Sequence, residues 1–458
     1  MGRKYDFNYI VIGSGPAGSA VALTLAKAKK RVALIENRFF GGSNINTRDV
    51  PYGVSLDFAH TYHKISRLPE FSHQDLSFNF PTIVAHQLKA IIESGGGNNQ
   101  KKFEDAGVVC IRGYANFLDN NTIAIGEQKF TASRFILATG SHLDTSTIAG
   151  TTTVNYLTPE TAIKIRRLPK AVLVVGGGST GCEIAEYYAK LGAKTLILEK
   201  SPRILPKEDP DVSEEITNYF TRELGIMVLS NSKAIAIEQD DLSKRVIFQS
   251  DHTEKMVRVD CIVLATGNKP TIDCGLENTN VKFQKTGAIK VDKFFQTSAK
   301  NIYAVGDCIG GESSTERADY EGKLLAKNLI NNTKNLINYR GFARTTNTSP
   351  AVVTIGPSEA ELKRDKRKYK KSIVYIKDIP ASKIYNAKYG FVKLLINRFG
   401  HIIGGCVVSN NAESISSEIA LAVRHNLTAI EIASTPHIAN DFSYAVQLAA
   451  KKLVSNKK

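Results

Sequence analysis

The stretch FNYIVIGSGPAG (residues 7–18) joins a short apolar run to a glycine-rich turn. Its glycines follow a GxGxxG pattern, with Gly13, Gly15 and Gly18 in the three places. Gly13 permits a tight turn, Gly15 lets the backbone approach a pyrophosphate, and Gly18 lets the next helix pack closely on the strand. A helical pattern and a second apolar run follow, and this run ends at Glu36, whose carboxylate can accept hydrogen bonds from a ribose. The stretch therefore predicts a strand, a turn and a helix that bind a dinucleotide.

The same pattern occurs again in the middle of the chain. The apolar run AVLVV leads into a second turn with glycines at Gly176, Gly178 and Gly181, and the next strand-like run ends at Glu199. Glu199 follows Gly181 by 18 residues, which is also the separation in the first copy. Two dinucleotide sites in one chain indicate FAD at one site and a nicotinamide nucleotide at the other.

The acid at the end of the second copy also informs the choice of nicotinamide nucleotide. A carboxylate at Glu199 favours a free ribose 2′-hydroxyl and repels a 2′-phosphate. We therefore expect NAD(H) to be preferred over NADP(H). Lys200 and Arg203 lie close by in the sequence and weaken this preference.

Composition places the chain among ordinary globular proteins. It has 458 residues, of which 42% are hydrophobic, and we expect two or three domains. The sequence has no apolar run of about 18 residues, so it predicts no transmembrane helix. We read no signal peptide and expect a cytoplasmic protein. The six cysteines form no CxxC pair, which favours buried thiols and predicts no metal site.

The chain is strongly basic, with a formal net charge of +16. Its densest basic run is KRDKRKYKK, residues 363–371. No nucleic-acid motif accompanies this run, so we interpret it as a solvated surface and expect no nucleic-acid partner. Peripheral contact with a membrane surface remains open.

Along essentially its whole length the chain resembles the pyridine nucleotide-disulfide oxidoreductases, the family of dihydrolipoamide dehydrogenase, glutathione reductase and mercuric reductase. Besides the two glycine turns, the resemblance rests on IYAVGDCIGG with Asp307, on GYANF with Ala115, and on the repeated segments FILATG and IVLATG. It implies a homodimeric α/β protein with two Rossmann-like dinucleotide-binding domains and a C-terminal α+β dimerisation domain. The implied boundaries are 1–150 for the first part of the FAD-binding domain, 151–267 for the NAD-binding domain, 268–343 for the remaining FAD-binding and central part, and 344–458 for the dimerisation domain.

The resemblance also assigns the residues that hold the cofactors. The FAD set comprises Gly13, Gly15, Gly18, Glu36, Gly42, Ser43, Ala115, Thr139, Gly140, Gly306, Asp307, Thr315 and Ala318. The NAD set comprises Gly176, Gly178, Thr180, Gly181, Glu183, Glu199 and Gly267.

The chain departs from the family at the redox centre. The family motif GGTCxxxGCxPSK aligns with GGSNINTRDVPYG, residues 41–53, so Asn44 and Asp49 stand in place of the two cysteines. Gly53 stands in place of a lysine that normally pairs with a glutamate beside the flavin, and the matching glutamate, Glu183, is present. Thiol–disulfide exchange needs a thiolate, which neither asparagine nor aspartate supplies.

The C-terminal end departs from the family as well. The family carries an HPTxxE acid–base pair there, and Ala439 and Tyr444 align with its histidine and glutamate. His437 lies two residues before Ala439, and a local structural role is the simpler interpretation. His60 and His63 share one face of an expected helix, but nothing completes a metal site around them.

The leading hypothesis is an FAD-dependent NAD(P)H oxidoreductase that passes electrons directly to a small acceptor such as a quinone, oxygen or a dye. Asn44, Arg48, Asp49 and Tyr52 would border the acceptor pocket, and Glu183 would serve catalysis. The alternative for Arg48 and Asp49 is that they pair with each other and fill the space that the cysteines leave. Two other functions stay open: a soluble nicotinamide nucleotide transhydrogenase, and an FAD- and NAD-binding partner or sensor protein with little turnover.

Overall fold

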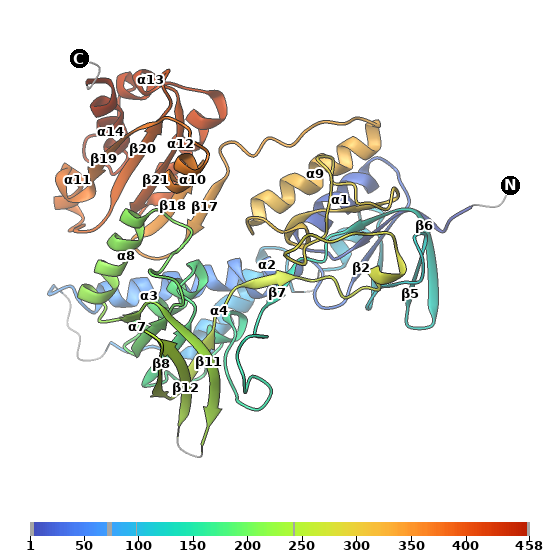
Figure 1. Cartoon of the computed structure of the whole chain (residues 1–458), viewed down its shortest axis with the longest axis horizontal. Coiled ribbons are helices and arrows are strands. Elements are labelled where there is room, and N and C mark those ends of the chain that lie inside the picture. Colours follow the sequence, from blue (N-terminus) through green and yellow to red (C-terminus); the bar gives the residue numbers. More distant parts are fainter. Residues whose placement is uncertain (1–3, 71–75, 98, 241–242, 456–458) are drawn as a thin grey trace. The chain divides into compact units, whose positions relative to one another are not determined.

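The computed structural model describes residues 4–70, 76–97, 99–240 and 243–455. Contacts within the chain divide it into two compact units (Figure 1). The first unit comprises residues 1–55, 81–144 and 267–338, and the second comprises residues 56–80, 145–266 and 339–458.

The first unit is built on a seven-stranded sheet of order β3-β2-β1-β6-β5-β4, with β16 paired to β6. The neighbours β1, β2 and β3 are parallel, as are β1, β6 and β16, whereas β5 runs antiparallel to β6 and β4. The strands are β1 (Phe7–Ile12), β2 (Val32–Glu36), β3 (Val109–Arg112), β4 (Asn116–Phe117), β5 (Thr122–Ile125), β6 (Gln128–Leu137) and β16 (Ile302–Ala304). A separate two-stranded sheet joins β7 (Ser141–Leu143) and β15 (Asn268–Pro270).

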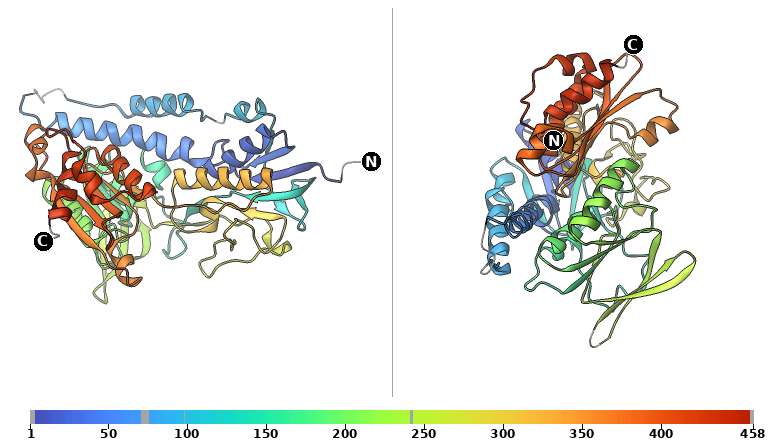
Figure 2. Two further views of the ribbon diagram at one scale, coloured as in Figure 1. Left: turned by 90° about the horizontal axis from the view of Figure 1, so that it is seen from above. Right: turned by 90° about the vertical axis from the view of Figure 1, so that its left-hand side faces the viewer.

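Helix α1 packs along helix α9 (Figures 1 and 2). Gly322 makes this close approach possible, because a Cβ atom there would lie 2.4 Å from the carbonyl oxygen of Ala17. The helices of this part of the chain are α1 (Pro16–Lys27), α2 (Gly42–Thr47), α3 (Asp49–Ile65), α4 (Phe80–Glu93), α5 (Lys101–Glu104), η1 (Leu276–Asn278), η2 (Gly306–Ile309) and α9 (Thr315–Asn331). The residues of α3 from Leu56 on, and Phe80 of α4, belong to the second unit.

The second unit contains a four-stranded parallel sheet of order β10-β9-β8-β14. This is the order of β3-β2-β1-β6 in the first unit, so the duplication read from the glycine turns extends to strand topology. Its elements are α6 (Pro159–Ala162), β8 (Ala171–Val175), α7 (Ser179–Lys190), β9 (Lys194–Leu198), α8 (Pro210–Glu223), β10 (Met227–Leu229) and β14 (Cys261–Leu264). An antiparallel three-stranded sheet follows β10 in the chain and joins β11 (Ser232–Gln239), β12 (Lys244–Ser250) and β13 (Thr253–Val259).

The C-terminal part of the second unit is a five-stranded antiparallel sheet of order β17-β18-β21-β20-β19. Helix α12 packs on β18 and β21, and α14 packs on β19 and β20. The strands are β17 (Ala343–Thr346), β18 (Ala351–Ile355), β19 (Lys370–Tyr375), β20 (Phe391–Ile396) and β21 (Ile402–Ser409). The helices are α10 (Glu359–Arg364), η3 (Ile376–Asp378), α11 (Pro380–Ile384), α12 (Ala412–His425), α13 (Ala429–Ser434) and α14 (Tyr444–Ser455).

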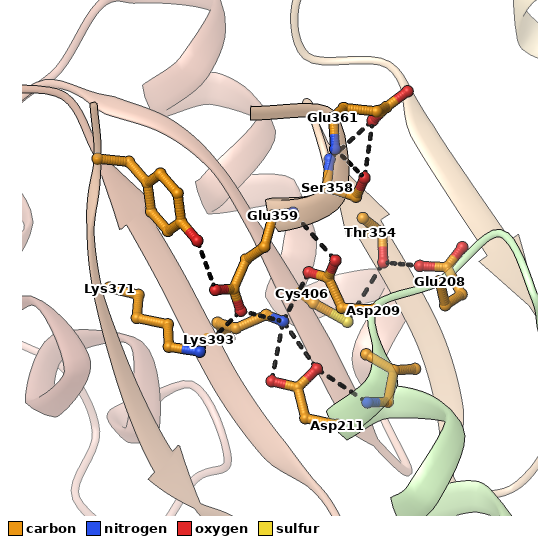
Figure 3. Close-up of polar contacts among 12 residues, drawn as sticks. Glu208, Asp209, Asp211, Thr354, Ser358, Glu359, Glu361, Lys371, Lys393 and Cys406 are labelled. Atoms are coloured by element: carbon orange, nitrogen blue, oxygen red, sulfur yellow. Dashed lines mark hydrogen bonds and ion pairs between the residues drawn. The ribbon is translucent and has the colours of Figure 1, made fainter. Parts of the chain in front are cut away.

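Strand β20 is apolar except for one charged residue, Lys393. Every residue of β20 is buried, including Lys393, whose side chain is 1% exposed. The ammonium group of Lys393 contacts carboxylates of Asp209 at 2.7 Å, Asp211 at 2.8 Å and Glu359 at 3.3 Å (Figure 3). Three carboxylates around one buried ammonium compensate its desolvation, which an apolar strand alone could not do.

Glu208, the residue before Asp209, makes further polar contacts with the same sheet. Its carboxylate accepts a 2.6 Å hydrogen bond from Thr354 and pairs with Arg344 at 3.3 Å. Thr354 and Arg344 are themselves opposite each other on β18 and β17. The segment that precedes α8 is therefore held on the sheet by charged groups.

Across the described ranges, no helix is both long and apolar enough to cross a bilayer.

Candidate dinucleotide and acceptor sites

The first glycine turn has the geometry that the sequence predicts. Gly13 has a φ of +97°, and a Cβ atom there would lie 2.2 Å from the carbonyl oxygen of Ala138. A Cβ atom on Gly18 would lie 1.8 Å from the carbonyl oxygen of Gly13. At Gly15, by contrast, an added Cβ would meet nothing within 4 Å, directly before the first residue of α1. The turn thus leaves an open cradle at a helix N-terminus, where a pyrophosphate is stabilised.

The glycines of the second turn have closely similar φ angles and Cβ clearances. Gly176 has a φ of +108°, and its Cβ would lie 2.3 Å from the carbonyl oxygen of Ala265. A Cβ on Gly181 would lie 1.8 Å from the carbonyl oxygen of Gly176, while one on Gly178 would meet nothing within 4 Å. Because both middle glycines face open space and both outer glycines are locked against backbone, each turn fits the phosphates of a dinucleotide.

The two acids at the strand ends are also equivalent. Both are buried, and each carboxylate accepts one hydrogen bond from a backbone N–H of its glycine turn and one from the backbone N–H two residues after the acid. Glu36 accepts hydrogen bonds from Ser14 at 3.0 Å and from Arg38 at 2.7 Å. Glu199 accepts them from Gly177 at 2.6 Å and from Ser201 at 2.7 Å. These contacts orient the two carboxylates beside the glycine cradles, where the ribose of a bound dinucleotide is recognised.

All the residues of the expected FAD set lie in the first unit. Gly42 approaches the glycine cradle closely, since its Cβ would lie 2.4 Å from the Cα atom of Gly15. Thr139 donates a hydrogen bond to the backbone carbonyl of Thr271, and Ala115 is buried. Gly140 and Gly306 both have positive φ, at +72° and +76°. Ser43 lies in the first turn of α2 and Ala318 in α9.

Asp307 is held in η2 by hydroxyl groups from two other segments. One oxygen of its carboxylate accepts hydrogen bonds from Ser141 at 2.9 Å and from Ser313 at 2.5 Å. The preceding Gly306 donates its N–H to the buried carboxylate of Glu321 at 2.8 Å, and Arg317 pairs with that carboxylate at 2.7 Å. Sequence reasoning found Asp307 but missed Glu321 and Arg317, although their i,i+4 spacing on a helix is a usable signal.

The two positions that replace the family cysteines are joined by a hydrogen-bonded bridge. Asn44 in α2 donates from its amide nitrogen to the hydroxyl oxygen of Thr315 at 2.6 Å. Thr315, the first residue of α9, donates its hydroxyl to a carboxylate oxygen of Asp49 at 2.8 Å. We call this set, Asn44–Thr315–Asp49, the polar bridge. Sequence reasoning placed all three residues near the flavin but did not foresee that Thr315 connects the other two.

The groups around Asp49 shift its pKa in opposite directions. The residue as a whole is exposed, yet neighbouring atoms crowd its carboxyl group, and this loss of solvation raises the pKa of Asp49 above its usual value. The Thr315 hydrogen bond and the charge of Arg48 lower the pKa, while the carboxylates of Glu316 and Asp307 raise it. The net direction is upward, so Asp49 binds a proton more readily than an ordinary aspartate.

The expected pairing of Arg48 with Asp49 is not what the structure shows. Within the described residues the two form no ion pair, and the hydrogen bond of Asp49 goes to Thr315. The physical reason is the break between α2 and α3, where Arg48 takes φ and ψ angles of −124° and −101° and leaves the helical path. Tyr52 is only 7% exposed and offers little free surface on which a planar acceptor could stack.

Glu183 lies in α7, in the second unit, with most of the expected NAD set. It is buried, and its carboxylate accepts a 2.7 Å hydrogen bond from the backbone N–H of Asn347. Thr180 occupies the second position of the same helix. Gly267 groups by contacts with the first unit, so the structure as described does not assemble it with the other residues of that set.

The histidines have structural partners. His60 lies 3.0 Å from the ammonium of Lys190, which itself pairs with Glu186 at 2.8 Å, and this Glu186–Lys190 pair is fully buried in α7. Burial and the Lys190 charge lower the pKa of His60 to about 4, and burial with the Arg67 charge lowers that of His63 to about 4. A neutral His60 can accept the Lys190 hydrogen bond, which explains the contact between two basic groups.

His437 is held within its own neighbourhood. One ring nitrogen lies 2.8 Å from the carbonyl oxygen of Thr435, and the other lies 2.9 Å from the carboxylate of Glu418 in α12. Both nitrogens are therefore used locally. Tyr444, which aligns with the family glutamate, is the first residue of α14.

Residues 7–322 match the family model of the pyridine nucleotide-disulphide oxidoreductases, and residues 342–450 match the model of its dimerisation domain. The chain is 28% identical over 436 residues to a mercuric reductase of Bacillus cereus, covering 94% of this chain and 69% of that protein. It is 28% identical over 460 residues to a dihydrolipoyl dehydrogenase of Buchnera aphidicola subsp. Baizongia pistaciae, covering 98% and 96% of the two chains.

Solved structures give the same fold. LpdA from Mycobacterium tuberculosis is 24% identical, with a TM-score of 0.86 over 97% of this chain and 99% of that chain. The HOCl-induced flavoprotein disulfide reductase RclA from Escherichia coli is 21% identical, with a TM-score of 0.85 over 97% and 99%. The family-model matches over residues 7–322 and 342–450 show that the chain belongs to the pyridine nucleotide-disulphide oxidoreductase family.

Proposed function

We propose that this protein is a homodimeric, FAD-dependent NAD(P)H oxidoreductase that delivers electrons to a small acceptor such as a quinone, oxygen or a dye, without a disulfide relay. NADH is the preferred reductant. The proposal departs from relatives that are named as disulfide reductases, and it rests on the chemistry of this chain's own side chains.

The observation that carries the proposal is the state of the thiols. A relay by thiol–disulfide exchange needs a thiolate, and reactive cysteines have lowered pKa values. Here burial raises the pKa of all six cysteines in the chain. The pKa values are about 11 for Cys110 and Cys261, about 12 for Cys274, Cys308 and Cys406, and well above the usual value for Cys182. None of these thiols is set up to act as a nucleophile near neutral pH.

The chain's remaining groups support cofactor binding and acceptor reduction. Bound flavin supplies the two-electron chemistry that links a nicotinamide to an acceptor. The open cradles at Gly15 and Gly178 receive pyrophosphates, and the fixed carboxylates of Glu36 and Glu199 receive ribose hydroxyls. Backbone N–H donors fix the orientation of the Glu199 side chain, and a carboxylate at this position favours NAD over NADP. The polar bridge offers an amide, a hydroxyl and a carboxyl group to an acceptor, in place of two sulfur atoms.

The test is anaerobic reduction of the purified yellow protein. One equivalent of NADH should bleach the visible flavin absorbance, and repeated additions of a quinone and NADH should give many turnovers per flavin. Titrating thiols before and after reduction should give the same number, because no disulfide is opened. Alkylating the reduced protein should leave the rate unchanged.

Cys110 provides the matched control, because it is the least buried of the six cysteines. The Cys110→Ser variant should keep the wild-type rate with quinone. Two newly exposed thiols on reduction, or inactivation by alkylation, would contradict the proposal. Turnover with a second nicotinamide nucleotide instead of quinone would favour the transhydrogenase, and bleaching without turnover would favour the sensor.

A further inference from the structure

The polar bridge has a fixed direction of hydrogen-bond donation. The amide nitrogen of Asn44 can only donate, so the Thr315 oxygen accepts from it. The single hydroxyl hydrogen of Thr315 is then directed at one oxygen of Asp49. Within the described residues the other carboxylate oxygen of Asp49 has no hydrogen-bond partner, and the residue is exposed. The bridge therefore orients one carboxyl group and leaves it in reach of protons from solvent.

The charged groups around Asp49 come from three elements. Arg48 lies in the turn before α3, Glu316 lies in α9, and Asp307 lies in η2 among the residues of the expected FAD set. Loss of solvation is the largest influence on the pKa of Asp49 and favours its neutral acid form; the Thr315 hydrogen bond and Arg48 oppose it, and the two carboxylates add to it. A carboxyl group that can stay protonated, at the position of a former redox cysteine, is a candidate proton donor.

We propose that Asp49, oriented by Thr315 and Asn44, is the proton donor to a quinone-type acceptor. This inference rests on the proposed function and names its substrate class. Reduction of a quinone to a hydroquinone takes two electrons and two protons, and NADH is oxidised to NAD⁺ with one proton arriving as part of the hydride. The second proton comes from Asp49: its O–H bond breaks, an O–H bond forms on the quinone oxygen, and solvent returns a proton to the carboxylate.

The experiment compares two acceptors that differ in their need for protons. A quinone consumes protons on reduction, whereas ferricyanide accepts one electron and no proton. The ratio of the quinone rate to the ferricyanide rate should fall about 100-fold in Asp49→Asn, because general acid catalysis contributes at least that much. Asparagine has the same shape and can still bond to Thr315, so this ratio isolates the lost proton. An unchanged ratio would overturn the inference.

Variants of Thr315 give a second, independent test of the Asp49 carboxyl group. The quinone rate should fall as pH rises through the pKa of Asp49, which gives the pH–rate profile a falling limb. The ferricyanide rate should show no such fall. The Thr315 hydrogen bond lowers the pKa of Asp49, so Thr315→Ala should move this limb to higher pH. Thr315→Ser keeps the hydroxyl and should restore the wild-type profile. A limb that stays in place in Thr315→Ala would show that the bridge is only structural.

A readout apart from activity is the infrared signal of the protonated carboxyl group. The wild-type protein should show an acid band that titrates above the usual range of aspartate, that is missing in Asp49→Asn, and that titrates at higher pH in Thr315→Ala. The two failures are distinguishable. If wild-type protein reduces neither acceptor, the proposed function is wrong, whereas turnover with an unaltered Asp49→Asn ratio or no such band rejects only the proton donor.

Discussion

Replacing the buried Lys393 should destabilise the second unit far more than replacing a neighbouring lysine that contacts the same carboxylate. Lys393→Met keeps most of the aliphatic stem and removes the ammonium from three carboxylates. The side chains of Asp209 and Glu359 are only 5% and 10% exposed, so both would lose a partner in a poorly solvated place. Removing one partner of such a buried pair costs about 3–5 kcal/mol. Asp211 is 29% exposed and can turn to solvent, so it adds less.

Lys371 is the matched control, because its ammonium lies 2.9 Å from the same Glu359. The side chain of Lys371 is 45% exposed, and an exposed pair contributes about 0–1 kcal/mol. The same change, Lys371→Met, should therefore have little effect. Both variants remove an ammonium group from Glu359, but Lys371 is half-exposed, whereas Lys393 is buried and also contacts Asp209 and Asp211.

Amide hydrogen exchange measured on peptides from β20 and α8 reports the local opening free energy. Exchange in these peptides should speed up roughly 150- to 5,000-fold in Lys393→Met, since each 1.36 kcal/mol is a factor of ten. Peptides from the seven-stranded sheet of the first unit serve as an internal reference. Equal protection in Lys393→Met and wild type, or equal losses in the two variants, would refute the reasoning that burial decides the value of this cluster.

Three further predictions concern the nucleotide sites and the histidine pair. Gly178→Val should leave the fold intact but weaken NADH binding at least tenfold in a fluorescence titration, because the valine side chain enters the open cradle. Gly181→Ala should instead lower the yield of folded protein, because its Cβ would lie 1.8 Å from a backbone oxygen. Glu199→Gln should reduce the preference for NADH over NADPH about tenfold in kcat/KM, a change of about 1.4 kcal/mol, and an unchanged preference would remove Glu199 from the specificity argument. The pKa of His60 is lowered to about 4, so the stability it contributes is complete above its usual pKa of 6.5 and is lost as pH falls toward 4. His60→Gln should flatten the fall in unfolding free energy between pH 7 and pH 5, measured in urea, and an unaltered slope would count against a buried neutral His60.

The sequence alone determined the two elements of strand, glycine turn and helix, because their conformation is decided by neighbouring residues. A glycine turn between an apolar strand and a helix can adopt few backbone paths, and both turns have the predicted glycine contacts. The largely apolar runs FVKLLI and IIGGCVVS form β20 and β21, whose residues are all buried. The absence of cysteine at positions 44 and 49 is likewise a property of the sequence.

Only the tertiary structure decided what the polar groups contact. Asn44 and Thr315 are 271 residues apart, and adjacent residues such as Arg48 and Asp49 invited a pairing that the helix break prevents. Lys393 sits in an apolar strand, and its three carboxylates come from two distant segments. Hydrophobic periodicity predicts which face of an element is buried, but a hydrogen bond or ion pair depends on which distant atoms the fold brings within about 3 Å. That distance is set by the packing of whole elements, so the polar bridge and the lysine cluster could be read only from the folded chain.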